Sequence, residues 1–190
     1  MANGLEDRNR ERELRIAQAR RAKVLRRSLW ATGIVLAIAG VVFVVARYAQ
    51  APANGPGQTI PDQGREHVPL GQAFEYNSNP PTSGPHFANP AEWGVYDKEI
   101  HDQILIHNLE HGGIWISYRP GVASSTVEQL AAIAKEFGRK VIMAPRQAND
   151  ADIALAAWNH LDKFSETEFS EERVREFIRA YRNRGPEFVP

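Results

Sequence analysis

The chain has 190 residues, no cysteine and a formal net charge of zero. Without cysteine, disulfides and thiolate metal sites are excluded, so any folded domain is held together by its core alone. The zero charge conceals an asymmetry, because residues 1–66 carry 11 Lys and Arg against 6 Asp and Glu, whereas residues 67–190 carry 12 against 17. This asymmetry predicts two parts of the chain that lie in different environments.

The first predicted element is a basic arm over residues 1–28. Its Arg, Ala, Leu and Glu residues favour a helix, and its positive charge favours contact with anionic lipid headgroups. The arm contains no aromatic residue that could stack on a base. We therefore expect a membrane lipid partner and no nucleic-acid partner.

A membrane span is predicted at residues 29–48. Leu29–Ala46 contains no charged residue, and as a helix these 18 residues extend about 27 Å, close to the hydrocarbon thickness of a bilayer. Trp30 and Tyr48 stand at the two ends, where interfacial aromatic residues are expected. The pattern indicates one transmembrane helix that contacts lipid.

This apolar run has two other interpretations. A buried core helix is disfavoured because no soluble domain precedes it in the sequence to cover it. A cleaved signal peptide is suggested by the small residues at 49–51, but the run exceeds the usual apolar region of about 7–15 residues, and Pro52 follows the cleavage position directly. We expect an uncleaved anchor.

The charges that flank the span predict its orientation. Nine basic residues precede the span, and only Arg47 follows it directly. Because cytoplasmic flanks carry the excess of Lys and Arg, the N-terminus is expected in the cytoplasm and the C-terminal part outside the plasma membrane.

Residues 49–66 are rich in Pro and Gly, which predicts a flexible linker, and residues 67–190 are predicted to form one extracytoplasmic domain. Its pattern predicts an α+β fold with a small mixed sheet and two main helices. One helix begins at the Ser125–Glu128 capping box and ends at Gly138, and the other begins after Ser170 and ends before Gly185. The predicted strands are Ala73–Tyr76, Ile104–His107, Ile114–Tyr118, Lys140–Ala144 and Ile153–Trp158.

The loop PPTSGPH, Pro80–His86, is the first stretch that could carry chemistry. Three prolines restrict its backbone, and Pro85 presents His86 on a stiffened segment. Such a loop suits a preorganised ligand or metal site. It equally suits a structural loop in which His86 bonds to a backbone carbonyl.

The second such stretch is HNLEHGG, His107–Gly113, whose letters match the inverted zinc-protease pattern H-x-x-E-H. On a strand His107 and His111 would stand about 13 Å apart, whereas on a helical turn they would be about 6 Å apart. The β-branched residues on both sides favour a strand end. We expect a compact turn at Gly112 and Gly113 that brings His111 back toward His107.

A protease would need a longer helix at HNLEHGG and a carboxylate ligand from downstream, so this interpretation is disfavoured. The sequence also has no glycine-rich phosphate loop, no G-x-S-x-G motif and no cofactor fingerprint. These features favour a binding domain over an enzyme.

Four motifs give the chain a resemblance to a known family: PPTSGPH (80–86), GVYD (94–97), HNLEHGG (107–113) and AYRNRGPE (180–187). With them the chain resembles the bacterial family called domain of unknown function 3105. The resemblance implies a short cytoplasmic tail, one membrane span and then the domain. It implies no activity.

We predict that the domain binds copper or zinc through His86, His107 and His111, with Glu110 as a fourth ligand or as a partner of a ligand. His67, His101 and His160 are expected to be solvated. One alternative is a cell-envelope interaction module with structural histidines, and another is a metal-dependent hydrolase. Three imidazoles that converge on one point would favour the metal.

Overall fold

The computed structural model describes residues 38, 40 and 55–189. The predicted arm at 1–28 lies outside these residues, and so does the predicted span at 29–48 except for Ile38 and Gly40, which are helical. Within the part of the chain that is described, no helix has both the length and the apolar composition needed to cross a membrane.

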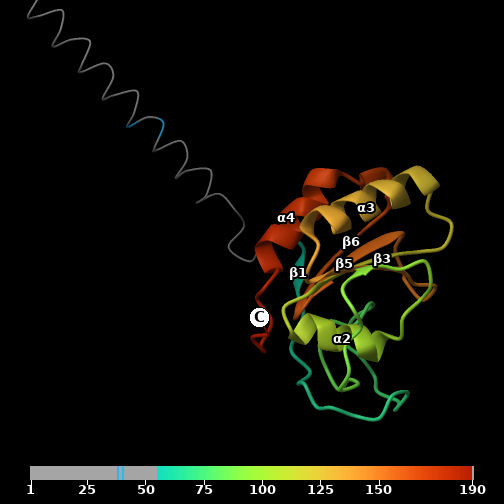
Figure 1. The fold of residues 1–190 in the computed structure, drawn as a ribbon, viewed down its shortest axis with the longest axis vertical. Helices are drawn as coiled ribbons and strands as arrows, with labels where there is room; N and C mark the ends of the chain where they lie inside the picture. The colour runs from blue at the N-terminus through green and yellow to red at the C-terminus, as the bar shows by residue number, and fades with distance from the viewer. Residues whose placement is uncertain (1–37, 39, 41–54, 190) are drawn as a thin grey trace, which may run out of the picture. The chain divides into compact units, whose positions relative to one another are not determined.

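A mixed sheet forms the centre of the domain (Figure 1). It has six strands in the order β1-β6-β5-β3-β4-β2. β3 and β2 each pair with β4 in parallel, whereas β5 pairs with β3, β6 with β5 and β1 with β6 in antiparallel fashion. The strands are β1 Gln58–Thr59, β2 Gly94–Val95, β3 Ile114–Tyr118, β4 Val141–Pro145, β5 Ile153–Ala157 and β6 His160–Phe164.

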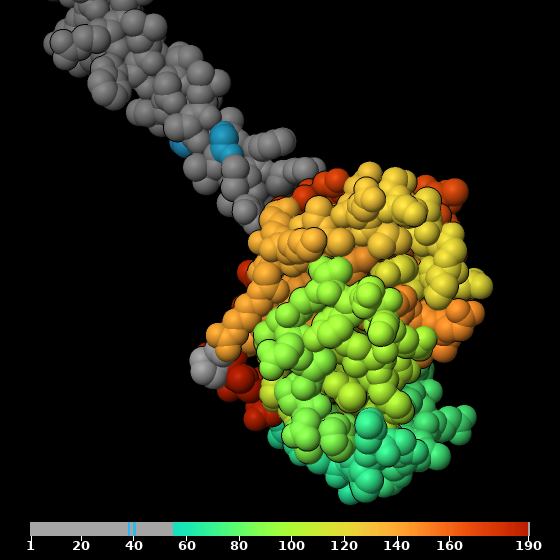
Figure 2. Space-filling view, turned by 45° about the vertical axis from the view of Figure 1, so that its right-hand side comes forward, coloured from blue at the N-terminus to red at the C-terminus, as the bar shows by residue number. Residues whose placement is uncertain are grey.

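Two helices cover one face of this sheet. α3, Ser124–Phe137, connects β3 to β4, and α4, Glu171–Tyr181, follows β6 and the short 3-10 helix η1, Glu166–Glu168. Alternate strand residues such as Ile114 and Ile116 pack with Leu130 and Phe177 into one apolar core. In Figure 2, α3 (yellow to orange) covers the upper part of the face turned forward, and the residues around α2 (green) lie below it.

The other face of the sheet is covered by α2, Asp102–Glu110, together with the chain that precedes it (Figure 1). Trp115 and Ile142 point from the strands into this second core, opposite to their neighbours in sequence, and meet Leu105 and Leu109. The α+β class, the mixed sheet and the two helices α3 and α4 are therefore as predicted.

The strand predicted at Ile104–His107 is wrong, because these residues belong to α2. Leu105, Ile106 and Leu109 are completely buried on one side of this helix. Their spacing is helical, and burial against the sheet outweighs the strand preference of the β-branched residues. The strand predicted at Ala73–Tyr76 is also wrong, because that segment is irregular.

Part of the predicted linker belongs to the sheet. β1 pairs with β6, and Ile60 is buried in the second core. The Oδ2 atom of Asp62 accepts hydrogen bonds from Trp158 Nε1 at 3.0 Å and from Asn159 Nδ2 at 2.8 Å. Among the described residues, the segment from 55 to 66 is thus an ordered edge of the domain rather than a flexible connection to it.

Candidate metal centre

The last turn of α2 presents three chemically important side chains. His107 and Glu110 stand three residues apart, and His111 is the C-terminal cap, whose backbone N–H donates to the carbonyl of His107. Residues three and four apart share one side of a helix, so these side chains are neighbours. Gly112 then leaves the helix with a φ of 76°, a conformation that glycine adopts without strain.

Two other segments, around residues 67 and 86, bring His67 and His86 close to the last turn of α2. The backbone N–H of His86 donates to the carbonyl of Glu66 at 2.9 Å, and the N–H of Val68 donates to the carbonyl of His86 at 2.8 Å. This short parallel bridge aligns His67 with His86. The Tyr76 hydroxyl secures the loop by donating to the carbonyl of Pro85 at 2.6 Å.

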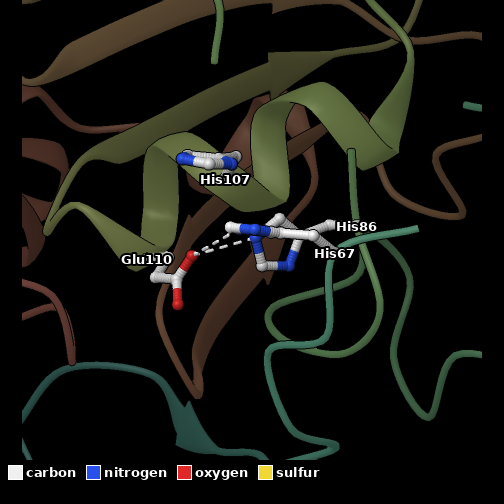
Figure 3. A group of neighbouring side chains, drawn as sticks. All are labelled: His67, His86, His107 and Glu110. Atoms are coloured by element: carbon white, nitrogen blue, oxygen red, sulfur yellow. Dashed lines mark hydrogen bonds and ion pairs between the residues drawn. The ribbon is translucent and has the colours of Figure 1, made fainter. Parts of the chain in front are cut away.

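These segments gather His67, His86, His107 and Glu110 into one group (Figure 3). One ligand atom from each side chain lies within 4.8 Å of the others. Glu110 Oε2 is 2.9 Å from His86 Nε2 and 3.6 Å from His67 Nε2. The ring centroids of His67, His86 and His107 are 4.9 to 5.1 Å from one another. His86 is fully buried, whereas the His67 side chain is 48% exposed, so the group reaches the surface at His67.

Backbone carbonyls determine which ring nitrogens of His86 and His107 are free. His86 Nδ1 donates to the carbonyl of Gly84 at 2.8 Å, and His107 Nδ1 donates to the carbonyl of Phe87 at 2.9 Å. A neutral imidazole with a proton on Nδ1 has a lone pair on Nε2. Burial lowers the pKa of His107, mainly by disfavouring the charged ring, and the nearby His111 and His86 lower it further. His107 is therefore neutral at neutral pH and offers its Nε2 as a ligand.

A second group lies beside the first and shares His107 with it. His111 Nε2 is 2.9 Å from His107 Nε2 and 3.3 Å from Glu187 Oε2. Glu187 comes from the C-terminal segment, which binds along the end of α2. The backbone N–H of Asn183 donates to the carbonyl of Gly112 at 2.8 Å, and that of Glu187 donates to the carbonyl of Glu110 at 3.1 Å.

The predicted ligands divide between these groups. His86, His107 and Glu110 come together, but the fourth member of their group is His67, which was expected to be solvated. His111 lies beside His107, as expected, although the reason is one turn of helix rather than a turn after a strand. Glu187 was not predicted as a site residue; its only sequence signal was its place at the end of the AYRNRGPE motif.

The other two histidines stand apart from these groups. His101 is exposed, as expected, and its Nδ1 accepts the N–H of Gln103 at the start of α2. His160 is half-buried rather than solvated and stacks on Tyr181 with 4.0 Å between ring centroids. Burial, followed by the nearby Arg184, lowers the pKa of His160.

Asn108 holds the turn of α2 that carries the ligands. It is buried, its Oδ1 accepts the N–H of Ala91 at 2.9 Å, and its Nδ2 donates to the carbonyl of Ala91 at 2.9 Å. Gly113 is also tightly packed, since a Cβ there would lie 2.6 Å from both the Asn108 carbonyl oxygen and the Trp93 ring. The motif is thus packed on both sides, which restricts the rotamers available to its histidines.

The fold and the site define the molecule as an α+β domain with a cluster of histidine and glutamate side chains that could hold a metal ion. The chain belongs to the family described as protein of unknown function (DUF3105), whose model matches residues 67–189. No curated protein and no solved structure matches the chain.

Proposed function

We propose that the domain binds one transition-metal ion, copper or zinc, through His67, His86, His107 and Glu110. The observation that carries the proposal is the contact between His86 and Glu110. With its Nδ1 proton donated to the carbonyl of Gly84, a neutral His86 turns the lone pair of Nε2 toward a carboxylate oxygen 2.9 Å away. The lone pair and the carboxylate repel each other, whereas a cation between the two atoms would be coordinated by both.

A structural role for the histidines requires a proton in the same place. Either His86 would then be an imidazolium paired with Glu110, or Glu110 would be a neutral acid that donates to His86 Nε2, and both groups are almost completely removed from solvent. The charged pair costs desolvation energy that its attraction often does not recover, and the neutral pair needs a carboxyl group that stays protonated at neutral pH. Metal-bound histidine commonly donates its other ring N–H to a carbonyl, as His86 and His107 both do here, and this favours the metal.

The ligand chemistry narrows the choice of ion. Three imidazoles and one carboxylate suit Zn²⁺ or Cu²⁺, whereas Cu⁺ prefers soft sulfur ligands. Met143 is the only sulfur-containing residue after Met1, and it is buried in the core on the α3 side of the sheet. Ligand atoms around tetrahedral zinc lie roughly 3.3 Å apart, and the distances from Glu110 Oε2 to His86 and His67 lie on either side of that value.

The test is a competition titration of the full-length protein with Zn²⁺ and with Cu²⁺ against a chromophoric chelator. His86→Ala, His107→Ala and Glu110→Gln should each weaken binding by more than about 100-fold, because groups that only hydrogen-bond to a metal ligand already contribute about 10–100-fold. His101→Ala is the matched control and should bind like the wild type. A wild-type protein that binds neither ion would refute the proposal.

A metal-dependent hydrolase is a second candidate, and one observation favours it. His107 lies in the last turn of α2, His111 caps this helix, and the downstream Glu187 lies near both, which gives the two histidines and the downstream carboxylate of an H-x-x-E-H site. Glu110 would be the general base. The zinc-loaded protein should then cleave a casein or ester substrate, and Glu110→Gln should abolish cleavage without releasing zinc. If the domain only binds the metal, neither substrate is cleaved.

We also propose the cellular arrangement on sequence grounds. The arm at 1–28 lies in the cytoplasm, residues 29–48 span the plasma membrane, and the domain lies outside. The excess of basic residues before the apolar run supports this orientation.

A further inference from the structure

A line of polar side chains leads from the surface to the buried group. The Glu187 side chain is 49% exposed, the His111 side chain is 14% exposed, and His107 is 4% exposed. Each member contacts the next, with 3.3 Å from Glu187 Oε2 to His111 Nε2 and 2.9 Å from there to His107 Nε2. Exposure thus decreases steadily along a set of three metal-ligating groups.

These three side chains have too few hydrogen-bond donors for the contacts between them. A neutral His107 has its lone pair on Nε2, because its one proton is on Nδ1 and is donated to the carbonyl of Phe87. His111 Nε2 therefore faces two acceptors, His107 Nε2 and the Glu187 carboxylate, and has at most one proton to share between them. A cation bound by all three atoms would satisfy them together, so the line is a ligand set in its own right.

The two groups cannot both be complete at one time. His107 belongs to each, yet it has one available nitrogen, since its Nδ1 is bonded to the carbonyl of Phe87. A bridging imidazole would need both nitrogens free. One ion at a time can therefore be bound through His107, either with His111 and Glu187 or with His67, His86 and Glu110.

We infer that His111 and Glu187 form an entry position, which takes the ion from solvent and passes it through His107 to the buried group. This inference rests on the proposed metal binding. The ion first meets the carboxylate of Glu187 and the ring of His111, and the shared ligand His107 remains bound while the other two are exchanged. The buried position retains the ion because His67, His86 and Glu110 take the place of His111 and Glu187 as ligands.

The alternative route leads through His67, whose side chain is 48% exposed. The two routes predict different kinetics. Ligands of an entry position lower the barrier in both directions, so losing them slows uptake and release by the same factor and leaves the equilibrium affinity unchanged. Ligands of the final position change the affinity itself.

The experiment is stopped-flow uptake of Zn²⁺ by the full-length protein, and release of the bound ion to excess chelator. Glu187→Gln and His111→Ala should slow both processes at least ~10-fold, the lower end of what local charge contributes to association rates, with an unchanged Kd and one ion per chain. Glu187→Gln keeps the shape of an exposed side chain, so a folding defect is not expected. Glu172→Gln, which removes an exposed carboxylate from α4, is the control.

Three results would overturn the inference. Unchanged rates in both variants would place the entry route elsewhere, with His67 as the candidate. A Kd weakened as much as by His86→Ala would make His111 and Glu187 permanent ligands. Two ions bound per wild-type chain would contradict the sharing of His107. If the wild type binds no ion, it is the proposed function that fails.

Discussion

At the scale of single residues, the position of one proton distinguishes a ligand from a packing residue. His86 and His107 are both buried, and in both the Nδ1 proton is donated to a backbone carbonyl. His86 Nε2 thereby faces Glu110, and His107 Nε2 faces His111. The PPTSGPH loop and the HNLEHGG motif drew attention to these two residues in the sequence, because prolines restrict the backbone before His86 and two glycines mark a turn after His111.

His67 could not be predicted in the same way. Its place in the cluster depends on a short bridge between segments about 20 residues apart, made by backbone groups of Glu66, Val68 and His86. Backbone bonds of this kind leave no periodic signal in the sequence. Exposure was expected at the edge of the domain, and His67 is indeed partly exposed, but its ring points into the cluster (Figure 3).

The first prediction concerns His160 and pH in the metal-free protein. Its pKa is lowered in the fold, so below the unfolded value of about 6.5 the unfolded chain binds more protons than the folded one. The stabilisation from neutral His160 is therefore present above that pH and is lost as the pH falls toward the folded pKa. His160→Phe, which keeps a ring against Tyr181, should remove this contribution.

The measurement is urea unfolding at a series of pH values below about 6.5, taken as the difference between variant and wild type. The free energy of unfolding should decline less steeply with acid in the variant. Some slope remains, because the pKa of His107 is lowered as well. An identical slope in both proteins would show that His160 does not contribute.

At the scale of elements, α2 shows where local propensity fails. Its sequence DQILIHNLE contains β-branched residues that favour a strand, yet Leu105, Ile106 and Leu109 are buried together only as a helix. Tertiary burial decided the outcome. Where burial and propensity agree the prediction held, as at β3, whose bounds match the predicted Ile114–Tyr118, and at α4, which Ser170 caps by accepting the N–H of Arg173.

The capping box predicted at Ser125 shows a related failure. The N-cap of α3 is Ala123, two residues before the predicted Ser125, and its side chain makes no capping hydrogen bond. Instead, Glu166 from η1 accepts the N–H of Ala123 at 3.1 Å and the hydroxyl of Thr126 at 2.7 Å. The cap is supplied by a residue 40 positions away from Thr126, which a local motif cannot reveal.

The second prediction concerns the packing between the end of α2 and the C-terminal segment. A Cβ at Gly112 would lie 2.9 Å from Asn183 Cα and 3.0 Å from Gly185 N, in a backbone conformation with positive φ. Gly71 has a similar φ of 84° but open space around it. Both alanine substitutions incur the cost of positive φ, about 1–2 kcal/mol, and only Gly112→Ala adds overpacking of about 1–3 kcal/mol.

Thermal unfolding of the two variants measures the difference. Gly112→Ala should lower the Tm clearly more than Gly71→Ala, and it should also slow zinc uptake, since the segment it displaces carries Glu187. Equal losses of Tm would mean that the C-terminal segment does not pack on α2 as described.

At the scale of the whole molecule, the domain is larger than its sequence signals suggest. The predicted boundary at residue 67 agrees with the start of the family match. Among the described residues, the domain nevertheless also includes β1 at the sheet edge and Ile60 in the core. The Pro and Gly content of residues 49–66 predicted a flexible linker, but composition does not reveal that Gln58 and Thr59 pair with β6.

The third prediction follows from this extension. A fragment of residues 52–190 should unfold cooperatively, and one of residues 64–190 should be less stable by at least about 2.5 kcal/mol. The shorter fragment loses burial of Ile60, about 1.5–3 kcal/mol, and leaves Trp158 Nε1 without its partner Asp62, about 1–3 kcal/mol. Urea unfolding measures both, and equal stability would show that residues 55–63 contribute nothing.

The fourth prediction tests the proposed topology. A reporter that is active only outside the cytoplasm, fused after Pro190, should be active, because the basic arm keeps the N-terminus inside. The same reporter fused before Met1 is the control and should be silent. Activity at the N-terminus alone would reverse the orientation, and a released soluble domain would show that residues 29–48 are a signal peptide.

The central claim is that His67, His86, His107 and Glu110 surround one metal ion. X-ray absorption at the zinc edge, on full-length protein loaded with one equivalent of Zn²⁺, observes these ligands directly. The account predicts nitrogen and oxygen neighbours at about 2.0–2.1 Å with the outer-shell scattering of three imidazoles, falling to two in His67→Ala. A zinc spectrum without imidazole scattering, or one unchanged in His86→Ala, would contradict it.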